Sequence, residues 1–481
     1  MGNYSVPESI RRMKPVGTMV KKIRNHYYVY EYSCRKDAQG KWKSVMGRNI
    51  GSITEELGFI PNNNFNADDE ITTLDFGQYA IALKNSKSVM DALLAVFNPK
   101  DACVIYLMGL IHFVNGFVPL KDIRDYYVQS WLSVKYPDAC MGVQSLSKLL
   151  DSLGRRQARV EQFEQNLLEA SSGKLAIDGH VIRSTSNCND LADFGNKYRL
   201  LKERQLNILM AYDIQTGRPV VSRIYDGGEL DKVSVKDILG RFDFHDTLFI
   251  VDRGFYSGAN IHAFSENGNH YIIPLAQNLK SYKAATERLS FEDRFVYEHG
   301  RKKSVIEYMQ SELPDGSGSV MVFRDVNENA VESDNYLKHL AKGLKGFSME
   351  EYEKLRPFFG MIVLQSNLQA GPKEVYSQYK NRWQIETFYN YFKNDIDYNA
   401  LGLTDYYMTQ GLSFIMLIAG LIHQTMQTAT KDMPETINEC LLKGRFIKAH
   451  KKHNKWQVTN VKKQYMELFA KLGIDLRIPI A

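Results

Sequence analysis

Three acidic residues stand at positions where a metal site could form. Asp178 lies inside an apolar, strand-like segment, Asp252 ends the apolar run 246–252, and Glu386 lies further along the chain. An acidic side chain in an apolar strand is costly unless it is paired or binds a metal ion. Carboxylates without His or Cys favour Mg²⁺ or Mn²⁺. Two such ions can clamp an in-line phosphoryl displacement. The alternative is three unrelated acids, one a strand-end cap.

Glu386 belongs to a stretch whose spacing predicts a functional helix face. Residues 374–395 contain no Gly or Pro, which allows a helix of about six turns. At about 100° per residue, Tyr379, Arg382, Glu386 and Lys393 share one narrow face. One carboxylate, two cations and a phenol suit a metal ion and a phosphate backbone. The alternative is a solvated face with ion pairs four residues apart, such as Arg382–Glu386.

The elements that carry these residues predict an α/β fold. Apolar segments at 174–184, 208–213, 219–225 and 246–252 read as strands, and helical segments follow the third and fourth. This order is that of an RNase H-like core. In such a core the two carboxylate-bearing strands and the late helix converge at one edge of the sheet.

The spacing of Tyr379, Arg382, Glu386 and Lys393 resembles the YREK signature of DDE transposases from bacterial insertion sequences. The resemblance covers residues 174–400 well and the flanks weakly. It implies that Asp178, Asp252 and Glu386 are catalytic residues and the ligands of two Mg²⁺ (or Mn²⁺) ions in a retroviral-integrase-like core. It further implies that Tyr379, Arg382 and Lys393 are DNA-binding residues that hold phosphates of the transposon end.

The resemblance implies a DNA transposase that acts as an endonuclease on transposon ends and joins them to target DNA. Its partners would be double-stranded DNA, both ends and target, held by a homodimer or higher synaptic complex. The long interval between Asp252 and Glu386 resembles that of the subgroup with a β-strand insertion. Some members of that subgroup form a DNA hairpin and use a tryptophan of the insertion to stabilise it. The insertion here has none, so Phe295, Tyr297 or Tyr308 would substitute, or no hairpin forms.

Composition shifts along the chain predict its domain organisation. Residues 1–60 are basic and contain an expected β-hairpin with interleaved aromatics, a candidate DNA-binding arm or a plain structural hairpin. The expected divisions that follow are a helical domain at 76–170, the RNase H-like core at 174–277 and 360–400, a β-rich insertion at 278–345, and a helical, basic C-terminal region at 401–481.

The charge, cysteine content and hydropathy of the chain are compatible with a cytosolic protein that binds nucleic acid. The chain has 481 residues, a net charge of +6 and a sequence pI of about 8.7. Its five cysteines are scattered without a CxxC pair, which argues against a disulfide framework or a zinc site. The longest apolar run, 412–422, is too short to span a bilayer and predicts a buried helix. We expect a cytoplasmic, nucleoid-associated protein.

Two other functions share this pattern. An RNase H-like nuclease would cut DNA without joining it. An inactive DNA-binding copy would regulate without cutting, although it would have no need of three carboxylates so placed. The basic flanks at 11–48 and 443–463 favour a protein that grips DNA ends.

Overall fold

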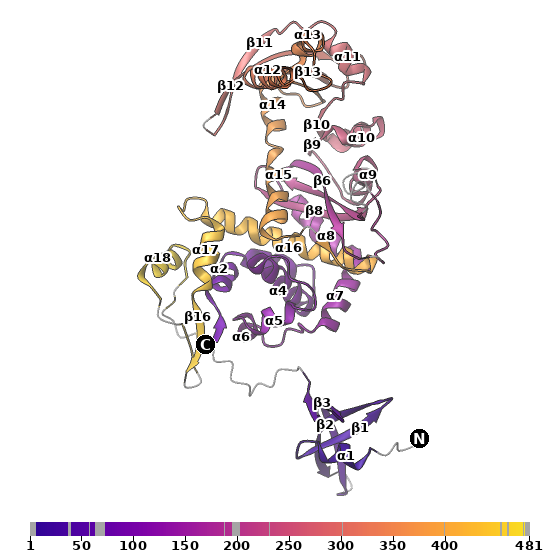
Figure 1. Cartoon of the computed structure of the whole chain (residues 1–481), viewed down its shortest axis with the longest axis vertical. Coiled ribbons are helices and arrows are strands. Elements are labelled where there is room, and N and C mark those ends of the chain that lie inside the picture. Colours follow the sequence, from indigo (N-terminus) through magenta and orange to yellow (C-terminus); the bar gives the residue numbers. More distant parts are fainter. Residues whose placement is uncertain are drawn as a thin grey trace. The chain divides into compact units, whose positions relative to one another are not determined.

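The computed structural model divides into two compact units, Met1–Thr72 and Thr73–Ala481 (Figure 1). The structure describes residues 6–36, 40–56, 58–62, 73–186, 188–194, 203–229, 231–300, 302–398, 400–452, 455–458, 461–474 and 476.

The first unit is a four-stranded antiparallel sheet in the order β1-β2-β3-β4 with one short helix. Its elements are α1 (Glu8–Arg12), β1 (Thr18–Ile23), β2 (His26–Lys36), β3 (Trp42–Thr54) and β4 (Gly58–Pro61). A small core of Ile10, Val29 and Ile53 holds the helix against the sheet. The expected hairpin is the β2–β3 pair, and the sheet around it is larger than the sequence pattern indicated.

The second unit begins with a short strand and a layer of helices. These elements are β5 (Thr73–Asp75), α2 (Gly77–Asn85), α3 (Lys87–Leu94), α4 (Pro99–Asn115), α5 (Ile123–Val128), α6 (Leu132–Lys135), α7 (Val143–Arg155) and α8 (Gln157–Glu169). The apolar spacing along α4 and α7 accounts for this layer, because nearly every residue of α4 is buried and α7 buries one leucine stripe.

Helix α16 (Tyr406–Thr430) joins the helical layer to the sheet by packing on α4, α7 and β8. Among the described residues it is the one helix long and apolar enough to cross a membrane, and 72% of its most apolar window is buried within the protein. Its crossing with α7 is very close, because a Cβ at Gly411 or Gly154 would meet the backbone of the other helix. The apolar run predicted as a buried helix is buried.

A ten-stranded sheet forms the rest of the framework, in the order β11-β12-β13-β14-β10-β9-β6-β7-β8 with β15 beside β6. Its strands are β6 (Lys174–Ser184), β7 (Gln205–Asp213), β8 (Arg218–Asp226), β9 (Leu248–Val251), β10 (His270–Pro274), β11 (Asp293–His299), β12 (Lys302–Glu312), β13 (Ser319–Asp325), β14 (Met361–Ser366) and β15 (Ala400–Leu401). Strands β6, β7 and β8 are antiparallel, and β9 and β10 run parallel to β6. With α9 (Asp231–Arg241) and α10 (Gly258–Ala263) between strands, this is the predicted RNase H-like order.

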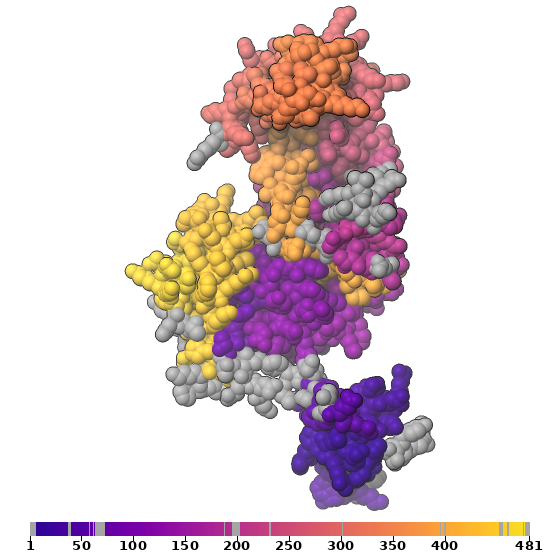
Figure 2. Space-filling model, viewed as in Figure 1, coloured from indigo at the N-terminus to yellow at the C-terminus, as the bar shows by residue number. Residues whose placement is uncertain are grey.

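The region 278–345 contains three strands, as expected of a β-rich insertion, and also helices that were not expected. Its three strands continue the main sheet through β14, and helices occupy much of the remainder. The helices of this region and of the segment after it are α11 (Lys280–Thr286), α12 (Val326–Ala341) and α13 (Met349–Leu355). Helix α12, whose surface is orange in Figure 2, packs on β12 and β13. Its sequence is mostly polar, so it carries little of the apolar periodicity that predicts a helix.

The C-terminal region also contains strands that the sequence pattern did not indicate. After α16 come α17 (Ile437–Arg445), β16 (Lys448–Lys452), β17 (Lys455–Val458) and α18 (Lys463–Lys471). Strand β16 pairs with β17 and, across the chain, with β5. Lysines dominate β16, and β17 is only four residues long, so the sequence pattern suggested a solvated face rather than a hairpin.

Candidate active site

Parallel pairing of β6 and β9 brings two of the predicted carboxylates side by side. Ile177 of β6 is the register partner of Val251 of β9. The residues that follow, Asp178 and Asp252, therefore occupy adjacent positions on neighbouring strands about 4.8 Å apart. Strand β9 ends at Val251, and the Asp252 carboxylate accepts the Arg253 backbone N–H at 2.8 Å. The sheet thus places both carboxylates at one level.

The expected helix over 374–395 is divided into three pieces. Helix α14 (Pro372–Lys380) ends before Arg382, α15 (Trp383–Asn390) follows, and a π-helical segment (Tyr391–Asp395) ends the stretch. At the break the Arg382 N–H donates to the carbonyl of Tyr379, three residues back, at 3.0 Å. A constant 100° per residue therefore fails beyond α15, because a π-helix has more residues per turn.

Helix α15 turns its apolar side to the sheet and Glu386 toward the two aspartates. Ile385 and Phe388 are buried, and the Phe388 ring lies 5.1 Å from that of Tyr212 on β7. The Tyr389 hydroxyl donates to the backbone carbonyl of Asp178 at 2.7 Å. This bond ties the helix that carries Glu386 to the strand that carries Asp178.

Arg382 connects the helix and strand carboxylates. Its guanidinium lies 2.6 Å from Glu386 Oε1 and 3.6 Å from Asp178 Oδ2, and the side chain is only 16% exposed. The guanidinium carbon also lies 5.9 Å from the centre of the Tyr379 ring. Arg382 therefore links two further members of the predicted helix face, Tyr379 and Glu386, to Asp178. The fourth, Lys393, lies on the π-helical segment with its side chain exposed.

The electrostatics of Asp178 show how closely these charges converge. Burial raises the pKa of its carboxyl to about 6. The Arg382 guanidinium and the Gly179 N–H lower it, and the carboxylates of Asp252 and Glu386 raise it. Burial also raises the pKa of Tyr379, which keeps its phenol protonated. The site gathers negative charge that a cation would stabilise.

Tyr389 is a site residue that the sequence interpretation did not single out. Its ring stacks on His180 at 5.0 Å and 21°, so His180 is packed beside the site. The spacing of Tyr389, one helical turn after Glu386, is a signal that could have identified it. Sequence spacing does not show which turn of the helix meets the strand.

The donor set fits a hard divalent cation by its chemistry. Asp178, Asp252 and Glu386 offer carboxylate oxygens, the ligands that Mg²⁺ and Mn²⁺ prefer. Within the described part of the chain, no three His, Cys, Asp or Glu side chains already surround a single point. Arg382 contacts Asp178 and Glu386 and partly neutralises them. Strand register thus sets Asp178 beside Asp252, and the Arg382 guanidinium links Asp178 to Glu386.

The aromatic residues considered for the insertion have packing partners. Phe295 and Tyr297 lie edge-on to Tyr376 of α14 at 5.7 and 5.2 Å, and Tyr308 lies 5.9 Å from Phe295. These contacts hold β11 and β12 against α14, immediately before the helix that carries the site.

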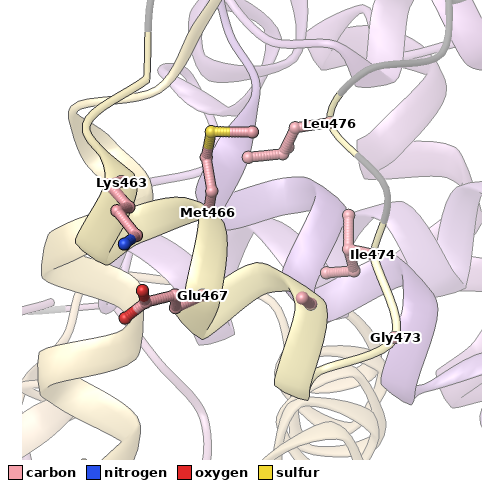
Figure 3. A pocket seen from close by; sticks show the side chains of 7 residues that line it. Lys463, Met466, Glu467, Gly473, Ile474 and Leu476 are labelled. Atoms are coloured by element: carbon pink, nitrogen blue, oxygen red, sulfur yellow. The ribbon is translucent and has the colours of Figure 1, made fainter.

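A hollow beside α18 lies elsewhere in the second unit (Figure 3). Its lining includes Met466, Glu467 and Ile474, and none of the predicted site residues. We assign it no part in the site.

The site lies in a part of the chain that matches a known protein family. A family model described as the transposase DDE domain matches residues 169–419, just over half of the chain, including all six predicted site residues. No curated protein sequence matches the chain. Among solved structures, a cryo-EM structure of a piggyBac transposase synaptic complex with hairpin DNA is similar at 9% identity and a TM-score of 0.40. The similarity covers 77% of this chain and 80% of that one.

Proposed function

The chain belongs to the family of DDE transposases, and on that premise we propose that Asp178, Asp252 and Glu386 form the metal-binding catalytic centre of a DNA transposase. It would cut the ends of an insertion sequence and join them to target DNA. The observation that carries the proposal is the junction of β6, β9 and α15. Strand register places the two aspartates together, and Arg382 contacts both Asp178 and Glu386.

The three carboxylates would hold two divalent ions, for which we propose Mg²⁺. When bound, such ions activate a water or a 3′-hydroxyl and stabilise the leaving oxygen of a phosphodiester. At pH 7 the Asp178 carboxyl, with a pKa of about 6, is mostly ionised and so able to act as a ligand. The hydroxyl of Tyr389 fixes the backbone of Asp178, which holds that ligand in place.

Arg382, Tyr379 and Lys393 would bind phosphates of the transposon end. The Arg382 guanidinium is the best placed, because it already lies against two carboxylates and is largely shielded from water. A guanidinium in such a place can offer paired donors to a phosphate. Lys393 is exposed on the next turn, where a lysine can reach a backbone phosphate.

The substrate and assembly follow from the same proposal. We propose double-stranded DNA, both transposon ends and target, as partner, and a homodimer or higher synaptic complex as the working unit, since two ends must be held together. The protein would act in the cytoplasm at the nucleoid. The net charge of +6 supports contact with a polyanion.

The test is cleavage and joining of DNA that carries the sequences flanking this gene, with Mg²⁺, by the wild type and by Glu386→Gln. We expect the wild type alone to cut at the ends and to join them to a second DNA, while both proteins bind the ends. Cutting without joining would instead support the RNase H-like nuclease. Binding by both proteins without any cutting would support an inactive, regulatory copy.

A further inference from the structure

A two-stranded ribbon projects from the sheet of the first unit. Strand β1 pairs with β2 only as far as Glu31, and β4 pairs with β3 only from Gly51. The distal halves of β2 and β3 therefore pair with each other alone among the described strands. Every described residue of 31–36 and 40–48 is exposed. A ribbon exposed on both faces contributes little to a core, so its side chains serve some other purpose.

Two cationic side chains lie opposite each other on one face of the ribbon. Arg35 and Lys43 are direct cross-strand partners, and both are exposed. Like charges directly opposite on a sheet are unfavourable, by up to about 1 kcal/mol. The segment 31–48 as a whole carries five basic residues against two acidic ones: Arg35, Lys36, Lys41, Lys43 and Arg48 against Glu31 and Asp37. This excess of basic residues gives the ribbon charge complementarity to a polyanion.

The opposite face is aromatic. The side chains of Tyr32 and Trp42 are 41% and 69% exposed, and the Lys36 ammonium lies 5.2 Å from the centre of the Trp42 indole. The Tyr32 hydroxyl is 3.0 Å from Ser44 Oγ, which stiffens the ribbon across its strands. The two faces therefore differ in chemistry, and the cationic one offers charge complementarity to a polyanion.

We propose that the ribbon inserts into the major groove of duplex DNA with Arg35 and Lys43 facing the groove. The inference rests on the proposed function for its ligand and extends it to a second binding surface, separate from the metal centre. A two-stranded ribbon fits a major groove about 12 Å wide. The deep, narrow major groove of duplex RNA does not admit it. This surface would recognise transposon ends before any chemistry takes place.

The test compares three full-length proteins in EDTA: the wild type, Arg35→Ala/Lys43→Ala, and the control Lys87→Ala/Lys100→Ala, which removes the same charge from exposed sites on α3 and α4. Fluorescence anisotropy measures the affinity of each for a 30-base-pair DNA, a length of about three helical turns, carrying the flanking sequence, and for the same sequence as duplex RNA. Salt titration gives the slope of log affinity against log salt concentration. Thermal melting checks that each variant folds.

We expect the ribbon variant to bind DNA at least about tenfold more weakly than the control, with a slope smaller by about two. Its affinity for RNA should equal that of the control. The exchange Arg35→Lys/Lys43→Arg keeps the charge and should bind DNA within about threefold of the wild type. Equal DNA binding by the ribbon variant and the control would overturn the proposal, and an equal loss on RNA would overturn insertion into the groove.

Cleavage at saturating DNA with Mg²⁺ separates this inference from the proposed function. If the wild type cuts and the ribbon variant binds DNA as well as the control does, the proposed function is supported and the ribbon proposal is wrong. If the wild type binds DNA through the ribbon but does not cut it, the ribbon proposal is supported and the proposed activity is wrong.

Discussion

The burial of Asp178 beside other carboxylates disfavours the stability of the fold but favours the binding of a cation. Asp178 is buried deeply enough for its pKa to rise to about 6, and it stands beside two further carboxylates. A buried acid of this kind lowers the stability of the fold whenever it is ionised. The same features make it a strong ligand for a cation. The sequence pattern predicted the position from the cost of an acid in an apolar strand, and the structure supplies the neighbours that explain it.

Asp178→Asn is expected to stabilise the metal-free protein at neutral pH. The folded pKa of Asp178 lies above its unfolded value of about 3.9, so its protonated form contributes stability that is full below pH 4 and lost as pH rises through 6. Asparagine cannot ionise. In EDTA, urea unfolding should show the variant more stable than the wild type by about 3 kcal/mol at pH 8 and by only about 1 kcal/mol at pH 4.5.

A variant that is less stable than the wild type by the same amount at both pH values would show that Asp178 is favourably paired in the folded state. Arg382 would then dominate over burial, against the direction of the pKa shift.

Arg382 makes one contact that helix spacing predicts and one that it does not. The i,i+4 ion pair with Glu386, the alternative to a functional face, is present at 2.6 Å. The same guanidinium also reaches Asp178 on β6. Helix periodicity predicts the first contact from sequence alone. The second depends on how α15 meets the sheet, which no local spacing specifies.

At the scale of elements, Tyr389 fixes α15 to β6 by its bond to the Asp178 carbonyl. Tyr389→Phe removes that bond and keeps the ring that stacks on His180. A lost hydrogen bond of this kind costs about 1 kcal/mol of stability. We expect the cleavage rate at saturating DNA to fall about tenfold, because misplacement of a ligand by a fraction of an ångström slows the chemical step.

Tyr398→Phe is the matched control, since the buried Tyr398 hydroxyl has no hydrogen-bond partner among the described residues. Its cleavage rate should equal that of the wild type. If the two phenylalanine variants cut equally fast, Tyr389 would have no positioning role.

The crossing of α7 and α16 depends on glycine. A Cβ at Gly154 would overlap the backbone carbonyl of Tyr407, whereas a Cβ at Gly240 on α9 meets nothing within 4 Å. Gly154→Ala should therefore lower the free energy of unfolding by about 2 kcal/mol or more, through displacement of the helices. Gly240→Ala should be neutral or slightly stabilising, because it restricts the unfolded chain. Thermal melting of both variants measures the difference, and equal melting temperatures would contradict the packing described.

Elements with strong apolar periodicity could be predicted from the sequence, and polar ones could not. The strands that carry Asp178 and Asp252 and the buried helix α16 follow from their apolar runs. Helix α12 and the short strands β16 and β17 carry too little periodicity to be recognised. The break at Arg382 has no Gly or Pro to signal it, because it arises where the chain passes from α14 to the sheet-bound α15.

At the scale of the whole molecule, one sheet links the candidate site to the region 278–345. Strands β11 to β13 extend it from β14, and their aromatic side chains pack on α14. The order of apolar strands and helices alone predicted the RNase H-like core, because its strands carry clear apolar runs. It could not predict that the later strands join the same sheet, since β14 returns between β13 and β10 from more than 35 residues away.

If Asp178, Asp252 and Glu386 bind the catalytic metal ions, as we propose, the variant Asp252→Cys should change which ion supports cutting. A thiolate ligand disfavours Mg²⁺ and accepts softer ions. We predict that Asp252→Cys fails to cut transposon-end DNA with Mg²⁺ and regains cutting with Mn²⁺ or Cd²⁺, while Asp252→Ala stays inactive with every ion. Normal cutting by Asp252→Ala with Mg²⁺ would contradict the account.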